Sequence, residues 1–148
     1  LEPDTKVIYL SPQGEPLNQK LVEELTKFDS LTLLCGRYEG GEERVIENDV
    51  DFEVSIGDYV ISGGELASMV LIDAVSRRLD NVLGNKDSLN DSFADKLLDY
   101  PHYTRPESID GESVPEVLLS GNQAKIDAWR QEQAMKKTKQ KRPDILSS

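Results

Sequence analysis

Residues 55–65, SIGDYVISGGE, decide the fold class, because they read as a strand that runs through a glycine-bearing loop into a helix. The sequence upstream repeats this order twice. The elements expected there are a buried strand over residues 7–10 that ends at residues 11–14, a helix over 17–28, a second buried strand over 31–35, a loop over 36–41 and a short helix near 42–47. Strands that alternate with helices predict an α/β fold with a parallel sheet and crossover connections.

Each of the three expected strands leads into a loop that contains glycine. In a parallel sheet the carboxyl ends of the strands meet at one edge, which is where α/β proteins bind ligands. The loops lack both the Gly-x-Gly-x-x-Gly turn of dinucleotide sites and the Gly-Lys-Ser/Thr of phosphate-binding loops. Glycine lets the main chain approach a ligand closely, so a cofactor that carries adenosine and is held by backbone groups fits. Taken alone, Gly57, Gly63 and Gly64 serve turns and helix packing equally well.

The helix expected over residues 64–78 is apolar around most of its circumference, and its polar residues are few. So wide an apolar face predicts burial on two sides. The sequence leaves two explanations open: the helix lies deep in a larger domain, or it packs against a second subunit.

The periodic pattern is lost after the helix, which predicts a domain boundary. We expect a first domain over residues 1–84, a linker over 85–99 and a helical segment over 100–148. The last segment contains the short apolar run 117–119 and a helix over about 122–139.

Charge is segregated along the 148 residues, whose net charge is −11. Residues 124–148 hold seven Lys or Arg and three Asp or Glu, net +4, whereas residues 1–123 hold ten against 25, net −15. The acidic body argues against nucleic-acid affinity over the whole surface. Five of the seven residues over 136–142 are basic, which suits a local phosphate contact or, equally, a solvated helix end.

The sequence contains one cysteine, Cys35, inside an apolar run, so it cannot form an internal disulfide and we expect a buried strand residue in a reduced, cytoplasmic protein. No stretch approaches the roughly 18 apolar residues that span a bilayer, so no membrane association is expected. The single histidine, His102, has no second histidine or cysteine pair beside it, so a structural or RNA-contacting role is expected instead of a metal-binding one.

Five strings of the sequence stand out together: VIYLSPQG at residues 7–14, CGRYEG at 35–40, SIGDYVISGGEL at 55–66, DSF at 91–93 and PHYTRP at 101–106. In order and spacing they resemble the bacterial tRNA (guanine-N1)-methyltransferase family over essentially the whole chain. The resemblance implies the SPOUT fold, an α/β parallel sheet whose deep trefoil knot forms the S-adenosylmethionine pocket. It also implies methyl transfer to guanine N1 at tRNA position 37, a homodimer with the active site between subunits, and tRNA binding by the C-terminal helical segment.

The resemblance also implies a set of site residues. The family's catalytic aspartate matches Asp91, and its supporting arginine matches Arg77. The cofactor-binding positions are Tyr9, Leu10, Ser11, Pro12, Gln13, Gly14, Gly36, Arg37, Tyr38, Glu39, Gly40, Ile56, Gly57, Asp58, Tyr59, Ile61, Gly63 and Gly64. Without the resemblance, Asp91 would be read as a helix cap and Arg77 as a cation at a helix C-terminus.

The family also has a magnesium requirement, which Glu39 or Asp58 could serve, although no ligand spacing supports it. The sequence opens at Leu1 without methionine, so we expect a piece of a longer protein that lacks the family's N-terminal segment and part of its C-terminal one. Whether the piece is active by itself stays open. Two other functions remain as alternatives: a noncatalytic S-adenosylmethionine-binding or dimerisation module, and an RNA-binding adaptor.

Overall fold

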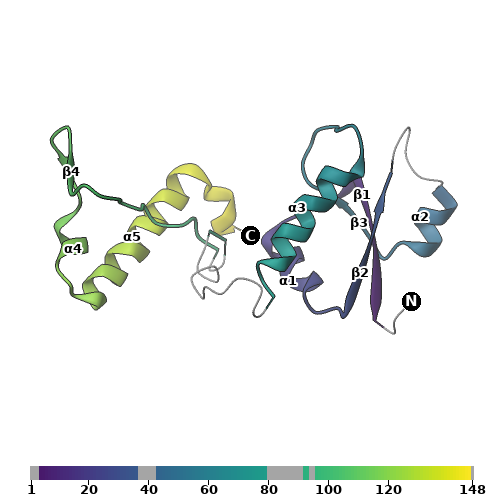
Figure 1. Cartoon of the computed structure of the whole chain (residues 1–148), viewed down its shortest axis with the longest axis horizontal. Helices are drawn as coiled ribbons and strands as arrows, with labels where there is room; N and C mark the ends of the chain where they lie inside the picture. Colours follow the sequence, from purple (N-terminus) through teal and green to yellow (C-terminus); the bar gives the residue numbers. More distant parts are fainter. Residues whose placement is uncertain (1–3, 37–42, 80–91, 94–95, 148) are drawn as a thin grey trace. The chain divides into compact units, whose positions relative to one another are not determined.

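The computed structural model describes residues 4–36, 43–79, 92–93 and 96–147. The chain divides into two compact units, Leu1–Ser88 and Leu89–Ser148. The first is a mixed α/β unit and the second is mostly helical (Figure 1).

A parallel sheet forms the centre of the first unit. Its strands are β1 (Thr5–Pro16), β2 (Ser30–Cys35) and β3 (Phe52–Ser55), in the order β2-β1-β3. Ile8 of the central strand pairs with Leu33 on one side and Phe52 on the other. The predicted α/β class with a parallel sheet is therefore confirmed.

The first strand continues beyond the point where the sequence predicts its end. Leu10 and Glu15 both pair with Val54, so residues 11–14 make an excursion from the ladder, after which β1 continues to Pro16. A Cβ on Gly14 would lie 2.4 Å from the backbone carbonyl carbon of Glu53. The glycine at this position therefore lets the two strands come together again, and its interpretation as a terminating turn is wrong.

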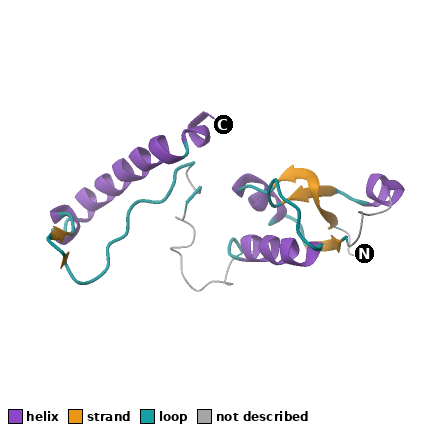
Figure 2. Cartoon of the chain, turned by 90° about the horizontal axis from the view of Figure 1, so that it is seen from above, coloured by secondary structure: helices purple, strands orange, loops and turns teal. Residues whose placement is uncertain are grey.

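The described residues of this unit form three helices: α1 (Gln19–Leu25), α2 (Glu43–Asp49) and α3 (Gly64–Ser76). Helix α1 begins later than predicted, because the Asn18 side chain caps it by accepting from the Leu21 N–H at 3.0 Å, and it ends at Leu25, before the predicted end at residue 28. Helices α1 and α3 lie on one side of the sheet and α2 on the other (Figures 1 and 2). The core between α1, α3 and the sheet includes Ile8, Leu25, Val54 and Leu71, each no more than 1 % exposed.

The third strand lies earlier in the sequence than predicted. It occupies Phe52–Ser55, and residues 56–63 form a loop that leads into α3. The apolar residues of this loop misled the prediction, because they face a cavity instead of a neighbouring strand.

In the second unit the longest element is α5 (Gln123–Lys141), which is capped by the Asn122 side chain. A short hairpin, β4 (Ser108–Ile109) and β5 (Glu112–Ser113), and α4 (Glu116–Leu119) precede it, and the 3₁₀ helix η2 (Pro143–Ser147) follows it. Leu97 is buried, and the Leu98 N–H donates to the Thr138 hydroxyl at 2.8 Å. The residues just before position 100 thus pack against α5.

Candidate functional site

The first unit contains a cavity of about 310 Å³ where β2 and β3 end and β1 leaves regular pairing. The residues that line it come from three loops and the strand and helix ends beside them: Tyr9, Leu10, Ser11, Pro12, Gln13, Gly36, Val54, Ser55, Ile56, Gly57, Tyr59, Val60, Ile61, Ser62, Gly63, Gly64 and Ala67. The cavity lies at the carboxyl ends of parallel strands, the edge at which α/β proteins bind ligands. The prediction that Gly36, Gly57 and Gly64 line one pocket is confirmed.

Glycines are needed around this cavity because other backbone or ring atoms lie close by. A Cβ on Gly36 would lie 2.8 Å from the Tyr9 hydroxyl oxygen, and a Cβ on Gly64 would lie 2.8 Å from the Cα of Cys35. Gly57 has a φ of +154°, and a Cβ there would lie 2.4 Å from the Tyr59 ring. The loops are therefore packed against one another and present main-chain groups to the cavity.

The loop after β3 is held in shape by its own hydrogen bonds. The Ser55 hydroxyl donates to the Gly57 carbonyl oxygen at 3.0 Å and accepts from the Gly57 N–H at 3.2 Å. The Tyr59 N–H then donates to the same Gly57 carbonyl at 2.9 Å. This turn fixes the wall of the cavity before any ligand binds, which lowers the entropy cost of binding.

None of the described residues that line the cavity carries a charged side chain. Its walls are aromatic, aliphatic, hydroxyl and main-chain groups. A ligand that depended on phosphate groups would find no Lys or Arg among these residues. The chemistry suits a ligand recognised by its shape and by backbone hydrogen bonds.

Most of the predicted cofactor residues that the structure describes lie around this cavity. Two do not line it: Gly14, which packs against β3, and Asp58. Arg37, Tyr38, Glu39 and Gly40 lie outside the described residues, so their placement stays a prediction. Five lining residues were missed. Val54, Ser55 and Ala67 belong to a strand and a helix whose side chains look like ordinary core in the sequence, and Val60 and Ser62 lie between predicted positions of the 56–64 loop.

Arg77 lies at the opposite end of α3 from the cavity. Gly64 begins this helix and lines the cavity, whereas Arg77 caps the C-terminal end, where its N–H donates to the Asp73 carbonyl at 3.1 Å. With a rise of about 1.5 Å per residue, the two positions are roughly 20 Å apart. Arg77 therefore does not line this cavity, and Asp91, its predicted partner in catalysis, lies outside the described residues.

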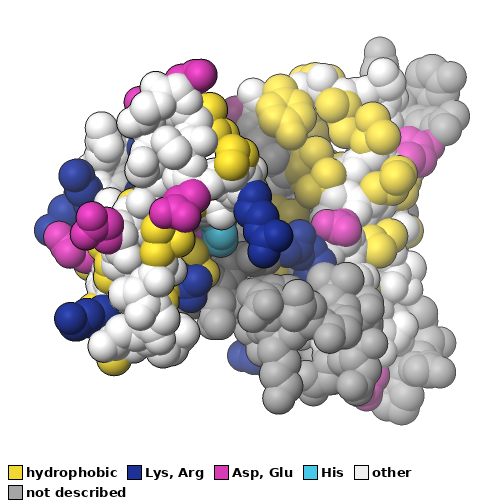
Figure 3. Space-filling view, turned by 60° about the vertical axis from the view of Figure 1, so that its left-hand side comes forward, with side chains coloured by type: hydrophobic (Ala, Val, Ile, Leu, Met, Phe, Trp, Pro, Cys, Tyr) yellow, Lys and Arg dark blue, Asp and Glu magenta, His cyan; other side chains and the backbone are white. Residues whose placement is uncertain are grey.

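One face of α3 is apolar and exposed. Gly64, Ala67, Ser68, Leu71 and Val75 are buried against the unit. On the other side Leu66 and Met69 are 62 % and 64 % exposed, and Val70 and Ile72 are about half exposed. Figure 3 shows hydrophobic side chains gathered on the surface of this unit. The prediction of burial on two sides is thus met on one side only within a single chain.

Cys35 is exposed, so its interpretation as a buried strand residue is wrong. It is the last residue of β2, and its sulfur lies 3.0 Å from the Ser68 hydroxyl oxygen. Among the described residues no group of three or more His, Cys, Asp or Glu side chains could hold a metal ion. Asp58 therefore has no ligand partners there, and Glu39 lies outside the described range.

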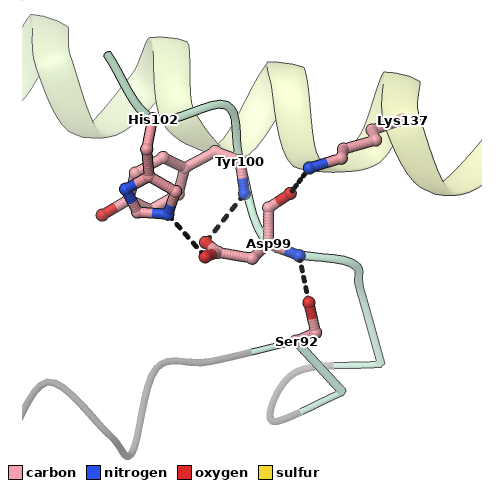
Figure 4. A network of polar contacts seen from close by, with 5 residues as sticks. All are labelled: Ser92, Asp99, Tyr100, His102 and Lys137. Carbon is pink, nitrogen blue, oxygen red and sulfur yellow. Dashed lines mark hydrogen bonds and ion pairs between the residues drawn. The ribbon is translucent and has the colours of Figure 1, made fainter. Parts of the chain in front are cut away.

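In the second unit, His102 has the hydrogen-bonded role that the sequence allowed (Figure 4). Its Nε2 lies 2.6 Å from a carboxylate oxygen of Asp99, whose other oxygen accepts the Tyr100 N–H at 2.8 Å. The Lys137 ammonium donates to the Asp99 carbonyl at 3.0 Å.

The basic residues near the end of α5 are not equivalent. Lys136, Lys139 and Lys141 are exposed, whereas Lys137 is partly buried against Asp99. Arg142 donates to Asp144 at 2.7 Å and 2.9 Å. The hydrogen bond and the opposite charge raise the pKa of Arg142 and lower that of Asp144.

Comparison with known proteins gives one consistent family. The model of a family described as tRNA (Guanine-1)-methyltransferase TrmD matches residues 1–148. A tRNA (guanine-N(1)-)-methyltransferase of Nitrosospira multiformis is 62 % identical over 144 residues, which cover 97 % of this chain and 56 % of the relative. One of Shewanella piezotolerans is 60 % identical over 146 residues, 98 % of this chain and 59 % of the relative. The chain thus spans less than two thirds of the length of these relatives.

Of the helices in the described residues, none combines the length and the hydropathy that a bilayer span requires.

Proposed function

The chain belongs to the tRNA (guanine-N1)-methyltransferase family, and on this premise we propose that the whole protein transfers a methyl group from S-adenosylmethionine to guanine N1 at tRNA position 37, next to the anticodon. The observation that carries the proposal is the uncharged, glycine-lined cavity at the carboxyl edge of the sheet, in a chain matched by the family over all 148 residues. We propose that the protein acts in the cytoplasm, because its proposed substrate is tRNA.

The cavity is the proposed S-adenosylmethionine site. When bound, this cofactor supplies the methyl group and carries a positive sulfonium, which the described walls, free of lysine and arginine, do not repel. The apolar walls suit the adenine ring, and main-chain groups of Gly36 and the 56–64 loop suit its polar edges. The resemblance also assigns residues 37–40 to this site; they include Arg37 and Glu39 and lie outside the described residues. The deep trefoil knot belongs to this proposal too, since threading would lock the loops in contact with one another.

We propose that two copies of the chain associate through the exposed face of α3. Leu66, Met69 and Val70 are neighbours at helical spacing and are each about half exposed or more. Burying an apolar side chain of this size contributes roughly 1.5–3 kcal/mol.

The position of Arg77 supports an active site between the copies. It lies roughly 20 Å along α3 from the cavity wall at Gly64, farther than one arginine side chain extends. If Arg77 acts in the reaction, it acts at the cavity of the second copy. A shared site then explains why the apolar face and the cavity belong to the same helix.

The chemistry needs a base and a cation. Guanine N1 becomes a nucleophile only when its proton leaves, and we assign that proton to the Asp91 carboxylate. A carboxylic acid is far stronger than the lactam, and each pKa unit of mismatch costs about 1.4 kcal/mol. We assign to Arg77 the stabilisation of the negative charge that develops toward guanine O6, which reduces this cost in the transition state.

The second unit is the proposed tRNA-binding segment. Residues 89–148 hold nine Lys or Arg and ten Asp or Glu, net −1, whereas residues 1–88 hold eight against 18, net −10. The basic end of α5 is therefore the part of the described chain best suited to phosphates.

The magnesium ion implied by the resemblance has no ligand set among the described residues, and no step is assigned to it.

The test is a methylation assay with the full-length protein, S-adenosylmethionine and a tRNA transcript, read out as N1-methylguanine by mass spectrometry of the digested RNA. The matched control is the same transcript with adenine at position 37. We expect one methyl group on the first transcript and none on the second. S-adenosylmethionine binding without methylation would indicate a noncatalytic binding module, and RNA binding without cofactor binding would indicate an adaptor.

A further inference from the structure

The second unit contains its own cavity, of about 810 Å³, between the segment 100–107 and the N-terminal half of α5. Tyr100, His102 and Tyr103 line it together with Arg105 and Arg130, and Leu118, Leu119 and Ile126 contribute an apolar wall. The methyl-transfer chemistry proposed above assigns no role to this cavity.

The segment that forms one wall is held in place by a polar network centred on Asp99 (Figure 4). The Asp99 N–H donates to the Ser92 hydroxyl at 2.9 Å, and its carbonyl accepts from Lys137. Its carboxylate accepts from the Tyr100 N–H and is hydrogen-bonded to His102 Nε2. The Tyr100 and His102 ring centroids lie 4.7 Å apart, and the angle between the ring planes is 35°. The aromatic rings are thus oriented in advance, so little entropy is lost when a flat ligand stacks on them.

Arg130 places a cation at the cavity. Its guanidinium lies over the Tyr100 ring, 4.7 Å from the centroid, and its Nε is buried without a hydrogen-bond partner among the described residues. The buried Nε is out of a ligand's reach, so a ligand would contact the outer guanidinium nitrogens, of which Nη1 lies 3.8 Å from the Asp127 carboxylate.

Charge distinguishes this cavity from a second hollow beside the hairpin, with which it shares Tyr103 and Glu107. The hollow beside the hairpin, of about 860 Å³, is lined by Glu107, Asp110 and Glu112 and by no Lys or Arg. The α5 cavity is lined by two arginines and one glutamate. An anionic ligand therefore belongs in the α5 cavity.

Flat aromatic rings and arginines in one place are what proteins use to bind unpaired bases of RNA. We infer that the α5 cavity binds one unstacked nucleobase of the RNA substrate, with His102 and Tyr103 against the face of the base and Arg105 and Arg130 toward its edge and the adjoining phosphate. This inference rests on the proposed function for the identity of the substrate. Tyr103 is 49 % exposed, so its ring is available to a ligand.

The test compares Tyr103→Leu with Tyr103→Phe in the full-length protein. Leucine keeps the apolar volume and removes the aromatic face, whereas phenylalanine keeps the face and removes the hydroxyl. Affinity for an anticodon stem-loop RNA is measured by fluorescence anisotropy over a salt series. We expect Tyr103→Leu to lower affinity about 5- to 150-fold, the range for loss of one stacked base, without changing the salt slope. Tyr103→Phe should bind within about twofold of the parent.

An abasic scan of the RNA loop identifies the base. One abasic position should weaken binding to the parent protein and leave binding to Tyr103→Leu unchanged. Equal losses for the two Tyr103 variants, or an abasic scan with no such position, would overturn the inference. A docking site for an apolar peptide would tolerate leucine and give no RNA effect.

The proposed function can fail separately from this inference. If the parent binds no RNA and methylates none, the proposed function fails. If the parent binds and methylates RNA and Tyr103→Leu matches it in affinity, only the base-binding role of the cavity fails. Cofactor affinity, measured by calorimetry, should be the same for both Tyr103 variants and the parent.

Discussion

The Gly64 N–H donates to the Gly36 carbonyl oxygen at 3.2 Å, which ties the first residue of α3 to the residue that follows β2. A Cβ on Gly64 would lie 2.8 Å from the Cα of Cys35. Two loops that are far apart in the sequence therefore meet with backbone against backbone. The cavity has its shape because no side chain separates them.

Gly64→Ala should damage this junction. Alanine would gain up to about 1 kcal/mol in helix propensity, but the overpacked contact with a backbone atom costs about 1–3 kcal/mol. We expect a lower free energy of unfolding in urea and S-adenosylmethionine affinity reduced about tenfold, equivalent to about 1.4 kcal/mol. The control is Gly111→Ala in the second unit, where φ is +86° and nothing lies within 4 Å. That change should cost stability only, and cofactor binding weakened equally by both changes would contradict the explanation.

Asp91→Asn and Arg77→Ala should lower turnover far more than cofactor affinity, because both residues are assigned to charge that appears in the transition state. We expect turnover to fall at least a hundredfold in single-turnover methylation assays. The neighbouring residue gives a matched control. Arg78 pairs with Glu23 at 3.0 Å, and losing this pair in Arg78→Ala should cost about 1 kcal/mol of stability or less. Near-normal turnover of Asp91→Asn would remove the general base from the mechanism.

Met69→Glu should separate the proposed dimer, since it places a charge on the exposed apolar face of α3. In light scattering at micromolar concentration the full-length variant should have the mass of one chain and the parent that of two. Ile109→Glu, on the hairpin of the second unit where Ile109 is also more than half exposed, is the control and should leave the mass unchanged. A parent that is itself a monomer would refute association through α3.

Asp51 should make the first unit sensitive to acid. Its carboxylate accepts from the Val7 N–H at 2.8 Å and from Lys6 at 3.3 Å, and these contacts lower its pKa. A lowered folded-state pKa gives stability that is present above the ordinary aspartate value of about 3.9 and lost as the pH falls through the lower folded-state value. Asp51→Asn should therefore unfold more readily than the parent near neutral pH and equally at the acid end, in urea melts across that range.

The sequence predicted the features that depend on local pattern. Strand β2 and helix α3 appear within one or two residues of their expected bounds, because a short apolar run and a long periodic one are strong signals. The sequence also predicted that the glycine loops meet at one cavity, since a parallel sheet brings the carboxyl ends of its strands together.

What the sequence could not reveal depends on contacts between distant residues. The return of β1 to the ladder after residues 11–14 rests on Gly14 meeting the backbone of β3. Cys35 looked buried from its apolar neighbours, yet it ends β2 and is exposed. The aromatic cavity on α5 needs residues 100–107 to fold back along a helix that begins sixteen residues later, and no local pattern predicts that.

The basic end of α5 contains residues with different tasks. The Lys137 ammonium donates to the Asp99 carbonyl, and Arg142 forms an ion pair with Asp144. Neither side chain is therefore fully available to contact a phosphate. Lys136, Lys139 and Lys141 are exposed. The contribution of this region to RNA binding should therefore depend mainly on these three lysines.

The triple change Lys136→Ala, Lys139→Ala and Lys141→Ala should weaken tRNA binding and flatten its salt dependence. Each lost phosphate contact reduces the slope of log affinity against log salt concentration by just under one unit. The triple change should therefore reduce this slope by up to about three units. The control neutralises exposed lysines of the acidic first unit, Lys20→Ala with Lys27→Ala, and should leave the slope unchanged. Lys137→Ala should instead lower thermal stability, because it removes the support of Asp99. If the triple change leaves both affinity and slope at the parent's values, these lysines form a solvated helix end, and tRNA is held elsewhere.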